Sequence, residues 1–284
     1  MSSRSEPFWL LLPGLLVLIL AFFWPVGELL VTSFFTAPQA GAPPAGTRAS
    51  AGLANYAKFF ADSYYLGVAE RTFRLSAITT FFTFLLGFPL AYIMARAGPR
   101  LRFWLIVLTV VPLMTSVVVR TFGWLVILGR GGLLSKVLEW TGLSASPIGL
   151  MHTETGIVVA MVQVLLPFMA LTIMGVIAGI DPKVEEAART MGAGFFGVMR
   201  TVIVPLSLPG IVAGSLLTFA LSISSFITPT LVGGVRLPMM AGGIFSHITG
   251  SLDWNFAAAM SMLLLLATLA VIVPYAMLLK RRGA

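Results

Sequence analysis

The chain has 284 residues, of which 58% are hydrophobic and 10% are charged, and its mean hydropathy is +0.99. Soluble proteins carry about a quarter charged residues, so this composition indicates a polytopic membrane protein. The formal net charge is +8, but most basic residues flank apolar stretches, which favours contact with anionic lipid headgroups over nucleic acid. The absence of cysteine excludes disulfides and thiolate chemistry.

Six apolar stretches are long enough to cross the hydrocarbon core of a membrane, which takes about 20 helical residues. They cover residues 8–35, 72–95, 103–128, 156–180, 204–230 and 256–279. We therefore predict an all-α integral membrane protein with six transmembrane helices in one domain that spans residues 1–284. The start of the chain loosely resembles a signal peptide, but its apolar run is far longer than a signal core, which favours a retained first helix.

Two segments outside these spans combine helical periodicity with mixed polar and apolar residues. The first reads LANYAKFFADSYYLG at 53–67, and the second reads GGLLSKVLEWTGL at 131–143. Aromatic, amphipathic segments of this kind favour the boundary between membrane and water. We expect both segments to lie along the outer surface of the membrane.

Basic residues gather at places that predict the orientation of the chain. They lie in the connection after the second span, in segment 181–203 and at the end of the chain: Arg96, Arg100, Arg102, Lys183, Arg189, Arg200, Lys280, Arg281 and Arg282. On the opposite side basic residues are more spread out and are mixed with acidic ones. Because cytoplasmic loops carry an excess of Lys and Arg, both termini and segment 181–203 are predicted to be cytoplasmic.

The sequence lacks the motifs of several enzyme classes. No Gly-Lys pair ends a phosphate-binding loop, and no G-x-S-x-G elbow is present to activate a serine. His152 and His247 are isolated and lack the spacing of a zinc site. We therefore predict no catalytic residue and no metal site, which leaves a transporter, a channel or a scaffold.

Segment 181–203 is polar enough to lie in water and is patterned as a short helix. Asp181 can cap a helix whose first residue is Pro182, and Gly192 and Gly194 can end it. The spacing places four apolar residues on one face and three charged residues on the other: Val184, Ala187, Ala188 and Met191 against Lys183, Glu185 and Arg189. A second apolar run then leads back into the membrane.

The same segment resembles the EAA loop of permeases from ATP-binding cassette (ABC) importers of type I. It contains Glu186-Ala187-Ala188, three further residues, Gly192, nine further residues and then VIVP at 202–205. The family has isoleucine and leucine where this chain has Val202 and Val204. The number of spans and the place of the loop before the fifth span also agree with these permeases.

Three further stretches look like the spermidine/putrescine branch of this family: LANYAKFF, LLPFMALTIMGVIAGID and ITPTLVGG. Permeases for ferric iron, aminoethylphosphonate and other small solutes share them. Polyamine permeases often carry an acidic residue just before an aromatic residue in the fifth-span segment, where this chain has Ser224-Ser225-Phe226. That difference weakens the case for a polycationic solute.

The resemblance implies a permease subunit in a bacterial inner membrane that binds no cofactor itself. ATP would be bound by a separate cytoplasmic ATPase dimer, whose groove would receive the helix in segment 181–203. The residues implied in this coupling contact are Val184, Glu185, Glu186, Ala187, Ala188, Arg189, Met191 and Gly192. A second permease, expected to be a sibling, and a periplasmic solute-binding protein would complete the importer. The alternative is that the charges on this helix are simply solvated.

Polar residues inside the spans are candidates for the solute pathway, because polar groups at membrane depth are costly. They are Glu28, Gln163, Ser222, Ser224, Ser225 and Thr228, with Arg120 and Thr230 as further candidates. Glu28 can instead reach the outer interface, Arg120 can serve structural pairing, and the serines can serve helix packing. On the outer face, Arg236, Asp253 and Trp254 are candidates for contact with the binding protein.

Three rival functions remain open at this stage. The first is an importer for another small solute, the second is a membrane scaffold that recruits a partner without transport, and the third is a secondary carrier. A carrier needs ion-coupling carboxylates near the midplane, and the spans offer almost none. Uptake that depends on ATP separates an importer from the other two.

Overall fold

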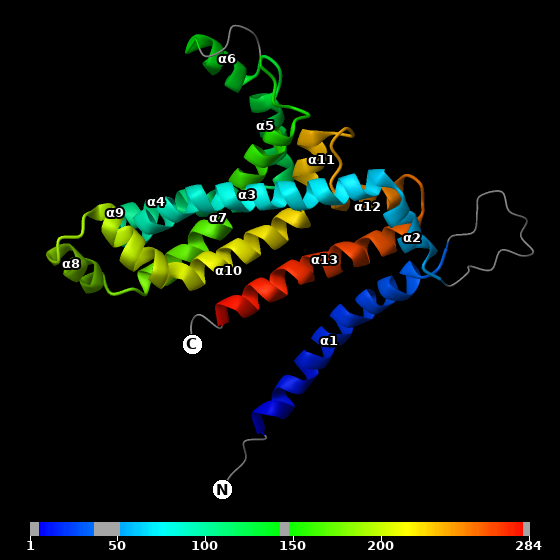
Figure 1. Ribbon diagram of the computed structural model, residues 1–284, viewed down its shortest axis with the longest axis horizontal. Coiled ribbons are helices and arrows are strands. Elements are labelled where there is room, and N and C mark those ends of the chain that lie inside the picture. The colour runs from blue at the N-terminus through cyan, green and yellow to red at the C-terminus, as the bar shows by residue number, and fades with distance from the viewer. Residues whose placement is uncertain (1–5, 37–51, 143–147, 281–284) are drawn as a thin grey trace, which may run out of the picture. The chain divides into compact units, whose positions relative to one another are not determined.

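The computed structural model describes residues 6–36, 52–142 and 148–280, and every regular element in these ranges is a helix (Figure 1). Six helical segments in this part of the chain are long and apolar enough to cross a membrane. The predicted all-α membrane architecture with six spans is therefore confirmed. The chain divides into two compact units, one of residues 1–66 and 243–267 and one of residues 67–242 and 268–284.

In the first unit, a short helix is tied to the end of the first span. Helix α1 (Glu6–Ser33) is followed by α2 (Ala54–Ala61), which lies in the first predicted interface segment. The Asn55 amide donates to the carbonyls of Ser33 at 2.9 Å and Phe35 at 2.8 Å, and the Ser33 hydroxyl lies 2.7 Å from that of Tyr56. These bonds fix α2 against the last turn of α1.

Helix α3 (Ser63–Arg96) is longer than the predicted second span at 72–95. It begins inside the segment that was expected to lie wholly along the interface, because Asp62 ends α2 in an extended conformation and its Oδ1 accepts the Tyr64 amide at 2.9 Å. From that cap the helix continues to Arg96 and includes Pro89, which membrane helices tolerate.

The predicted third span at 103–128 is wrong as a single helix. The structure has α4 (Pro99–Met114) and α5 (Val117–Leu128), with Thr115 and Ser116 extended between them. Pro112 lies in the last turn of α4, and its carbonyl accepts both the amide of Thr115 at 3.3 Å and the hydroxyl of Thr115 at 2.8 Å. These bonds close the helix end. The helix expected at 131–143 is present as α6 (Leu133–Trp140), but it ends a candidate membrane span of residues 117–140 instead of forming a separate interface segment.

The core of the second unit forms where α7 (Glu154–Ala178) packs along α10 (Val204–Ile223). Figure 1 shows α3, α7 and α10 running alongside one another in this unit. One apolar cluster gathers around α7 and α5, and a second gathers around the other end of α7 and the segment before α10. Small residues allow this close packing: a Cβ on Gly210 would meet the Val176 side chain at 2.8 Å.

The predicted fifth span at 204–230 is interrupted. Helix α10 ends at Ile223, residues 224–226 break the helix, and α11 (Ile227–Gly233) follows. Pro229, in the first turn of α11, has no amide hydrogen, so no backbone hydrogen bond from it to the Ser225 carbonyl can span the break. The Ser224 hydroxyl also bonds back to the Ala220 carbonyl at 2.8 Å.

The remaining helices complete the chain. Helices α8 (Pro182–Thr190), α9 (Phe195–Val198) and the π-helix η1 (Met199–Ile203) connect α7 to α10. Helix α12 (Met240–Thr249) precedes α13 (Trp254–Lys280), which contains the last predicted span. Both helices contribute residues to each unit.

Candidate functional site

Helix α8 begins and ends as its sequence predicts. Asp181 is the N-cap, and its Oδ1 accepts the Lys183 amide at 2.9 Å, while Pro182 occupies the first helical position. At the other end Gly192 has φ +89°, a left-handed conformation that glycine adopts without a steric penalty. The Ala193 amide then bonds to the Ala188 carbonyl at 3.1 Å, which satisfies a helix-end acceptor in a Schellman motif.

The two faces of α8 differ from the predicted ones. Glu185 and Ala188 point inward and are 5% and 6% exposed, whereas Val184 and Met191 point outward and are 43% and 83% exposed. The prediction that Glu185 shares the outer polar face is therefore wrong, and so is the placement of Ala188 with the outward apolar residues. Ala188 packs into the second apolar cluster of its own chain.

Glu185 is buried because α3 supplies its hydrogen-bond donors. Its Oε1 lies 2.6 Å from both Nε and Nη2 of Arg96, and its Oε2 accepts the Tyr92 hydroxyl at 3.0 Å. Arg96 Nη2 also donates to the Ile180 carbonyl at 3.0 Å, in the connection from α7 to α8. Sequence reasoning missed Tyr92 and Arg96, since nothing in their own neighbourhood indicates a partner in α8.

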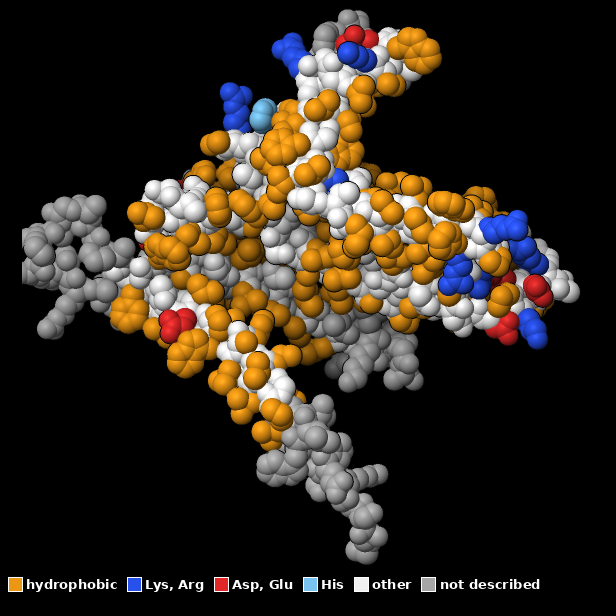
Figure 2. All heavy atoms as spheres, turned by 180° about the vertical axis from the view of Figure 1, so that it is seen from behind, with side chains coloured by type: hydrophobic (Ala, Val, Ile, Leu, Met, Phe, Trp, Pro, Cys, Tyr) orange, Lys and Arg blue, Asp and Glu red, His pale blue; other side chains and the backbone are white. Residues whose placement is uncertain are grey.

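The outward face of α8 offers a small, mixed surface for binding. Glu186, Ala187 and Arg189 are exposed there beside the two outward apolar residues. Figure 2 shows basic and acidic side chains gathered at the end of the second unit that carries α8, with many hydrophobic side chains along the helices beside it. This arrangement suits contact with a protein partner in water. The coupling role of these residues stays a prediction.

The structure separates the predicted pathway residues by burial. Ser222 and Thr228 are buried, Gln163 and Ser225 are half-buried, and Ser224 is exposed, as is the further candidate Thr230. Ser222 Oγ is buried without a hydrogen-bond partner. The group therefore includes buried, half-buried and exposed side chains.

Two of these residues form bonds between helices. Gln163 of α7 accepts the indole N–H of Trp124 from α5 at 3.2 Å. Thr228 of α11 lies 3.2 Å, oxygen to oxygen, from Thr121 of α5. The sequence analysis named neither Thr121 nor Trp124, because each was counted as part of an apolar span.

The two charged candidates differ in setting. Glu28 lies on α1 in the first unit and is exposed. Arg120 lies on α5 in the second unit, where its Nη2 donates to the Thr115 carbonyl at 3.2 Å at the break before α5. Its Nε and Nη1 are buried without a hydrogen-bond partner. Arg120 thus supports the backbone at the break between α4 and α5.

Helix α3 carries a buried row of hydroxyls that the sequence analysis did not single out. Its members are Thr72, Ser76, Thr79 and Thr83, each fully buried. Their spacing of four, three and four residues places them on one face of the helix, and this spacing was readable in the sequence. Thr72 Oγ1 accepts the Met240 amide at 2.8 Å, so at least one of them serves packing.

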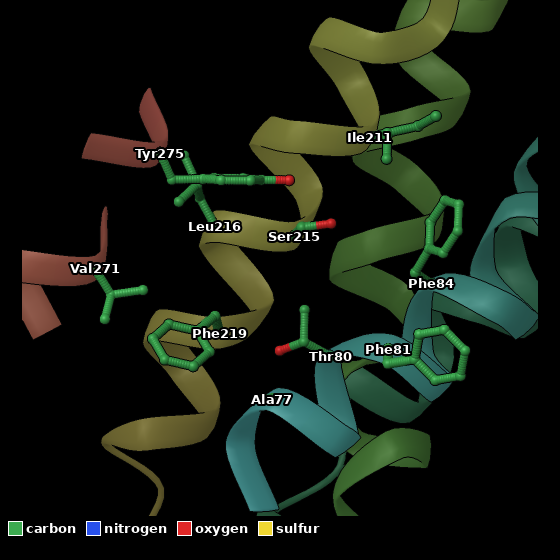
Figure 3. Close-up of a pocket in the computed structure, with 10 residues that line it drawn as sticks. All are labelled: Ala77, Thr80, Phe81, Phe84, Ile211, Ser215, Leu216, Phe219, Val271 and Tyr275. Carbon is green, nitrogen blue, oxygen red and sulfur yellow. The ribbon is translucent and has the colours of Figure 1, made fainter. Parts of the chain in front are cut away.

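A pocket of about 400 Å³ opens between α3, α10 and the second half of α13 (Figure 3). Its walls are apolar except for the hydroxyls of Thr80, Ser215 and Tyr275. No predicted pathway residue lines it. Within the described ranges, no three His, Cys, Asp or Glu side chains lie close enough together to hold a metal ion.

The candidate residues for contact with the binding protein lie on different units. Asp253 and Trp254 are in the first unit, where Asp253 Oδ2 lies 3.5 Å from Lys58 Nζ and Trp254 is exposed. Arg236 is in the second unit and is exposed. Contact of these residues with a binding protein stays a prediction.

Known proteins are similar to this chain over most of its length. The family described as "Binding-protein-dependent transport system inner membrane component" matches residues 87–282. The spermidine/putrescine transport system permease protein PotB of Haemophilus influenzae is 32% identical over 269 residues, covering 94% of this chain and 88% of that protein. PotB of Escherichia coli is 31% identical over 247 residues, covering 87% of this chain and 88% of that protein.

A solved structure shares the fold. A bacterial ABC transporter involved in the import of the acidic polysaccharide alginate matches with a TM-score of 0.79 at 15% identity, covering 98% of this chain and 96% of that chain. At this identity the likeness concerns the fold alone.

Proposed function

Because the chain belongs to the family of binding-protein-dependent transport system inner membrane components, and is a permease subunit of an ABC importer rather than an enzyme, we propose that its solute is a polyamine. The fold is that of the type I importer permeases, as the resemblance of the EAA loop implied. The observation that carries the proposal is the likeness to two PotB proteins over most of the chain.

We further propose that α8 is the part of the chain that docks on a separate ATPase, which binds the ATP. Its inward face is occupied by contacts with α3 and the apolar core, so the outward residues remain for a partner. Val184 and Met191 are exposed apolar side chains on a helix that is otherwise rich in charge, which suits insertion into a groove.

The remaining parts of the importer follow from the same proposal. A second permease, which we expect to be a sibling chain, would form the other half of the pathway, and a periplasmic binding protein would deliver the solute. The distribution of Lys and Arg supports an orientation with α8 and both termini in the cytoplasm.

Reconstitution tests the proposed solute directly. The chain is assembled with its co-transcribed ATPase, second permease and binding protein in proteoliposomes, and uptake of labelled spermidine and putrescine is measured with and without ATP. We expect ATP-dependent uptake that unlabelled polyamine suppresses. Uptake of neither polyamine, together with ATP-dependent uptake of another solute that the binding protein holds, would refute the polyamine assignment and keep the importer.

One observation favours another small solute as the second candidate. The break after α10 presents Ser224, Ser225 and Phe226 and no carboxylate, so these residues offer a polycation no opposite charge. An aminoethylphosphonate or ferric iron importer is the alternative. Competition by these solutes in the same proteoliposomes separates the two candidates.

A further inference from the structure

We propose that the ion pair between Arg96 and Glu185 is the joint that makes α8 move as one body with α3. The consequence of this joint for transport rests on the proposed docking of an ATPase on α8.

The bonding of Glu185 leaves its carboxylate little freedom to rotate. Two guanidinium nitrogens of Arg96 contact Oε1 at 2.6 Å, and the Tyr92 hydroxyl donates to Oε2 at 3.0 Å. The Tyr92 ring packs edge-to-face on Phe195 of α9, with ring centroids 6.1 Å apart, and this contact helps to orient its hydroxyl. Both carboxylate oxygens of Glu185 are therefore bonded to side chains from one turn of α3.

The same guanidinium also holds the connection that precedes α8. Arg96 Nη2 donates to the Ile180 carbonyl at 3.0 Å, between the end of α7 and the Asp181 cap. One side chain at the end of α3 thus bonds to both the start of the connection and the first turns of α8. A displacement of α8 relative to α3 has to break several charge-assisted bonds together.

Among the residues whose burial is described, Glu185 is the only charged side chain that is buried. α8 itself buries little apolar surface, because its other buried residue is Ala188, which has a single side-chain carbon. A buried ion pair adds little net stability compared with apolar residues of similar size, but it specifies one geometry, since removal of one partner leaves a buried charge unpaired. This property suits a joint.

The consequence for transport follows from the two faces of α8. A partner on the outward face would push a helix whose inward face is fixed to α3. Force on α8 would then reach a membrane span directly, in addition to the covalent path through η1 into α10. Loss of the pair would leave α8 folded and able to dock but would let it move without α3.

A spin-label distance measurement tests the joint without any partner. The chain has no cysteine, so labels at Ile93→Cys on α3 and Thr190→Cys on α8, both exposed, are unique. In the full-length permease we expect a narrow distance distribution, which broadens in Glu185→Gln and in Arg96→Gln. The matched control is Glu70→Gln, which breaks an exposed ion pair with Arg74 on the same α3 and is expected to leave the distribution narrow. An unchanged distribution in both single variants overturns the proposal.

The double variant Arg96→Gln/Glu185→Gln separates a joint from a merely stabilising pair. It leaves no buried charge unpaired, so we expect thermal stability to recover towards wild type. If the pair is a joint, the distance distribution stays broad and solute-stimulated ATP hydrolysis in the reconstituted importer stays about tenfold below wild type, although ATPase binding is kept. Recovery of stimulation together with stability overturns the proposal.

The measurement of ATPase binding and the distance measurement test the proposed docking and the joint separately. Failure of the wild-type chain to bind the ATPase through α8 refutes the proposed docking. The distance distributions still decide whether the pair holds α8 on α3. Normal ATPase binding with narrow distributions in all variants refutes the joint alone.

Discussion

The indole Nε1 of Trp124 donates a hydrogen bond to Oε1 of Gln163 at 3.2 Å and so joins α5 to α7. The bond occupies one of the two lone pairs of Gln163 Oε1, so the second lone pair and the NH₂ group remain for a solute. Because the pair joins two helices and also presents these polar groups, it has a structural role and a candidate pathway role that mutation can separate.

Replacement of Gln163 or of Trp124 should decrease stability by a similar, small amount. The two replacements should differ in their effect on transport. Gln163→Leu and Trp124→Phe each remove one hydrogen bond between helices, worth about 0.6 kcal/mol on average in membrane proteins. We expect similar, small decreases in the thermal unfolding temperature of the purified permease. Only Gln163→Leu should raise the KM of uptake, because only it removes the polar groups that remain for the solute. Equal KM values for the two variants would assign Gln163 to packing.

Gly192 should tolerate substitution according to backbone preference and not according to size. A Cβ at this position meets nothing within 4 Å, but φ is +89°. A left-handed conformation costs a residue with a side chain about 1–2 kcal/mol, less for asparagine and most for β-branched residues. We therefore expect uptake to decrease in the order Gly192→Asn, Gly192→Ala, Gly192→Val. The measurement is uptake with solute-stimulated ATP hydrolysis at matched expression. Normal coupling in Gly192→Val would contradict both the strain argument and the role of the turn.

The ends of α8 were predictable because the information is local. A cap, a proline and a glycine are each recognised by their own backbone requirements, and they lie within twelve residues of one another. The inward face of α8 was not predictable in the same way. It is selected by Tyr92 and Arg96, 93 and 89 residues from Glu185 in the chain. Helical periodicity places Glu185 on a face but does not say what that face contacts.

Hydropathy could not predict the helix breaks within the spans, for a related reason. Membrane helices tolerate proline, and Pro89 and Pro167 both lie inside continuous helices here. Pro112 and Pro229 lie beside breaks instead, where threonine and serine hydroxyls bond to nearby carbonyls. A proline with adjacent hydroxyls was a weak signal in the sequence, and apolar length alone could not detect it.

His247 should make the first unit sensitive to mildly acidic pH. Burial is the main cause that lowers the pKa of its imidazole, Lys58 lowers it further, and Asp253 opposes the decrease. Its ring nitrogens lie 3.1 Å from Ser251 Oγ and 3.4 Å from the Tyr65 hydroxyl. Because the pKa in the folded state is below the usual value of about 6.5, the unfolded state binds a proton first as the pH falls. Stability should therefore be independent of this group above that value and decrease below it.

Thermal unfolding between pH 7.5 and pH 5 checks this prediction, with His247→Gln as the comparison. The variant should lose the part of the pH dependence that begins near the usual histidine pKa. The pH dependence that the variant keeps comes from groups other than His247. Identical pH profiles for the two proteins would show that His247 does not contribute.

Met169 lies between glycines of two neighbouring helices, and the two contacts should differ in their tolerance of a methyl group. A Cβ on Gly87 of α3 would meet Met169 Cγ at 2.9 Å and Cβ at 3.3 Å, whereas a Cβ on Gly214 of α10 would meet Met169 Sδ at 2.9 Å. Sδ can move by rotation of the side chain, but Cγ and Cβ are close to the α7 backbone. Gly87→Ala must therefore push α3 away from α7 and should destabilise the permease by about 1–3 kcal/mol, while Gly214→Ala should cost less.

The double variant Gly87→Ala/Met169→Ala identifies the cause. Met169→Ala alone leaves a cavity in the core, since the side chain is fully buried, and should destabilise by about 2–5 kcal/mol. If the clash with Met169 is what makes Gly87→Ala costly, the double variant is more stable than the sum of the two losses predicts, because the added methyl group fills part of the cavity. Denaturant unfolding of the purified chain in detergent measures all three variants. Additive losses would mean that Gly87 is required for its backbone and not for the space that Met169 occupies.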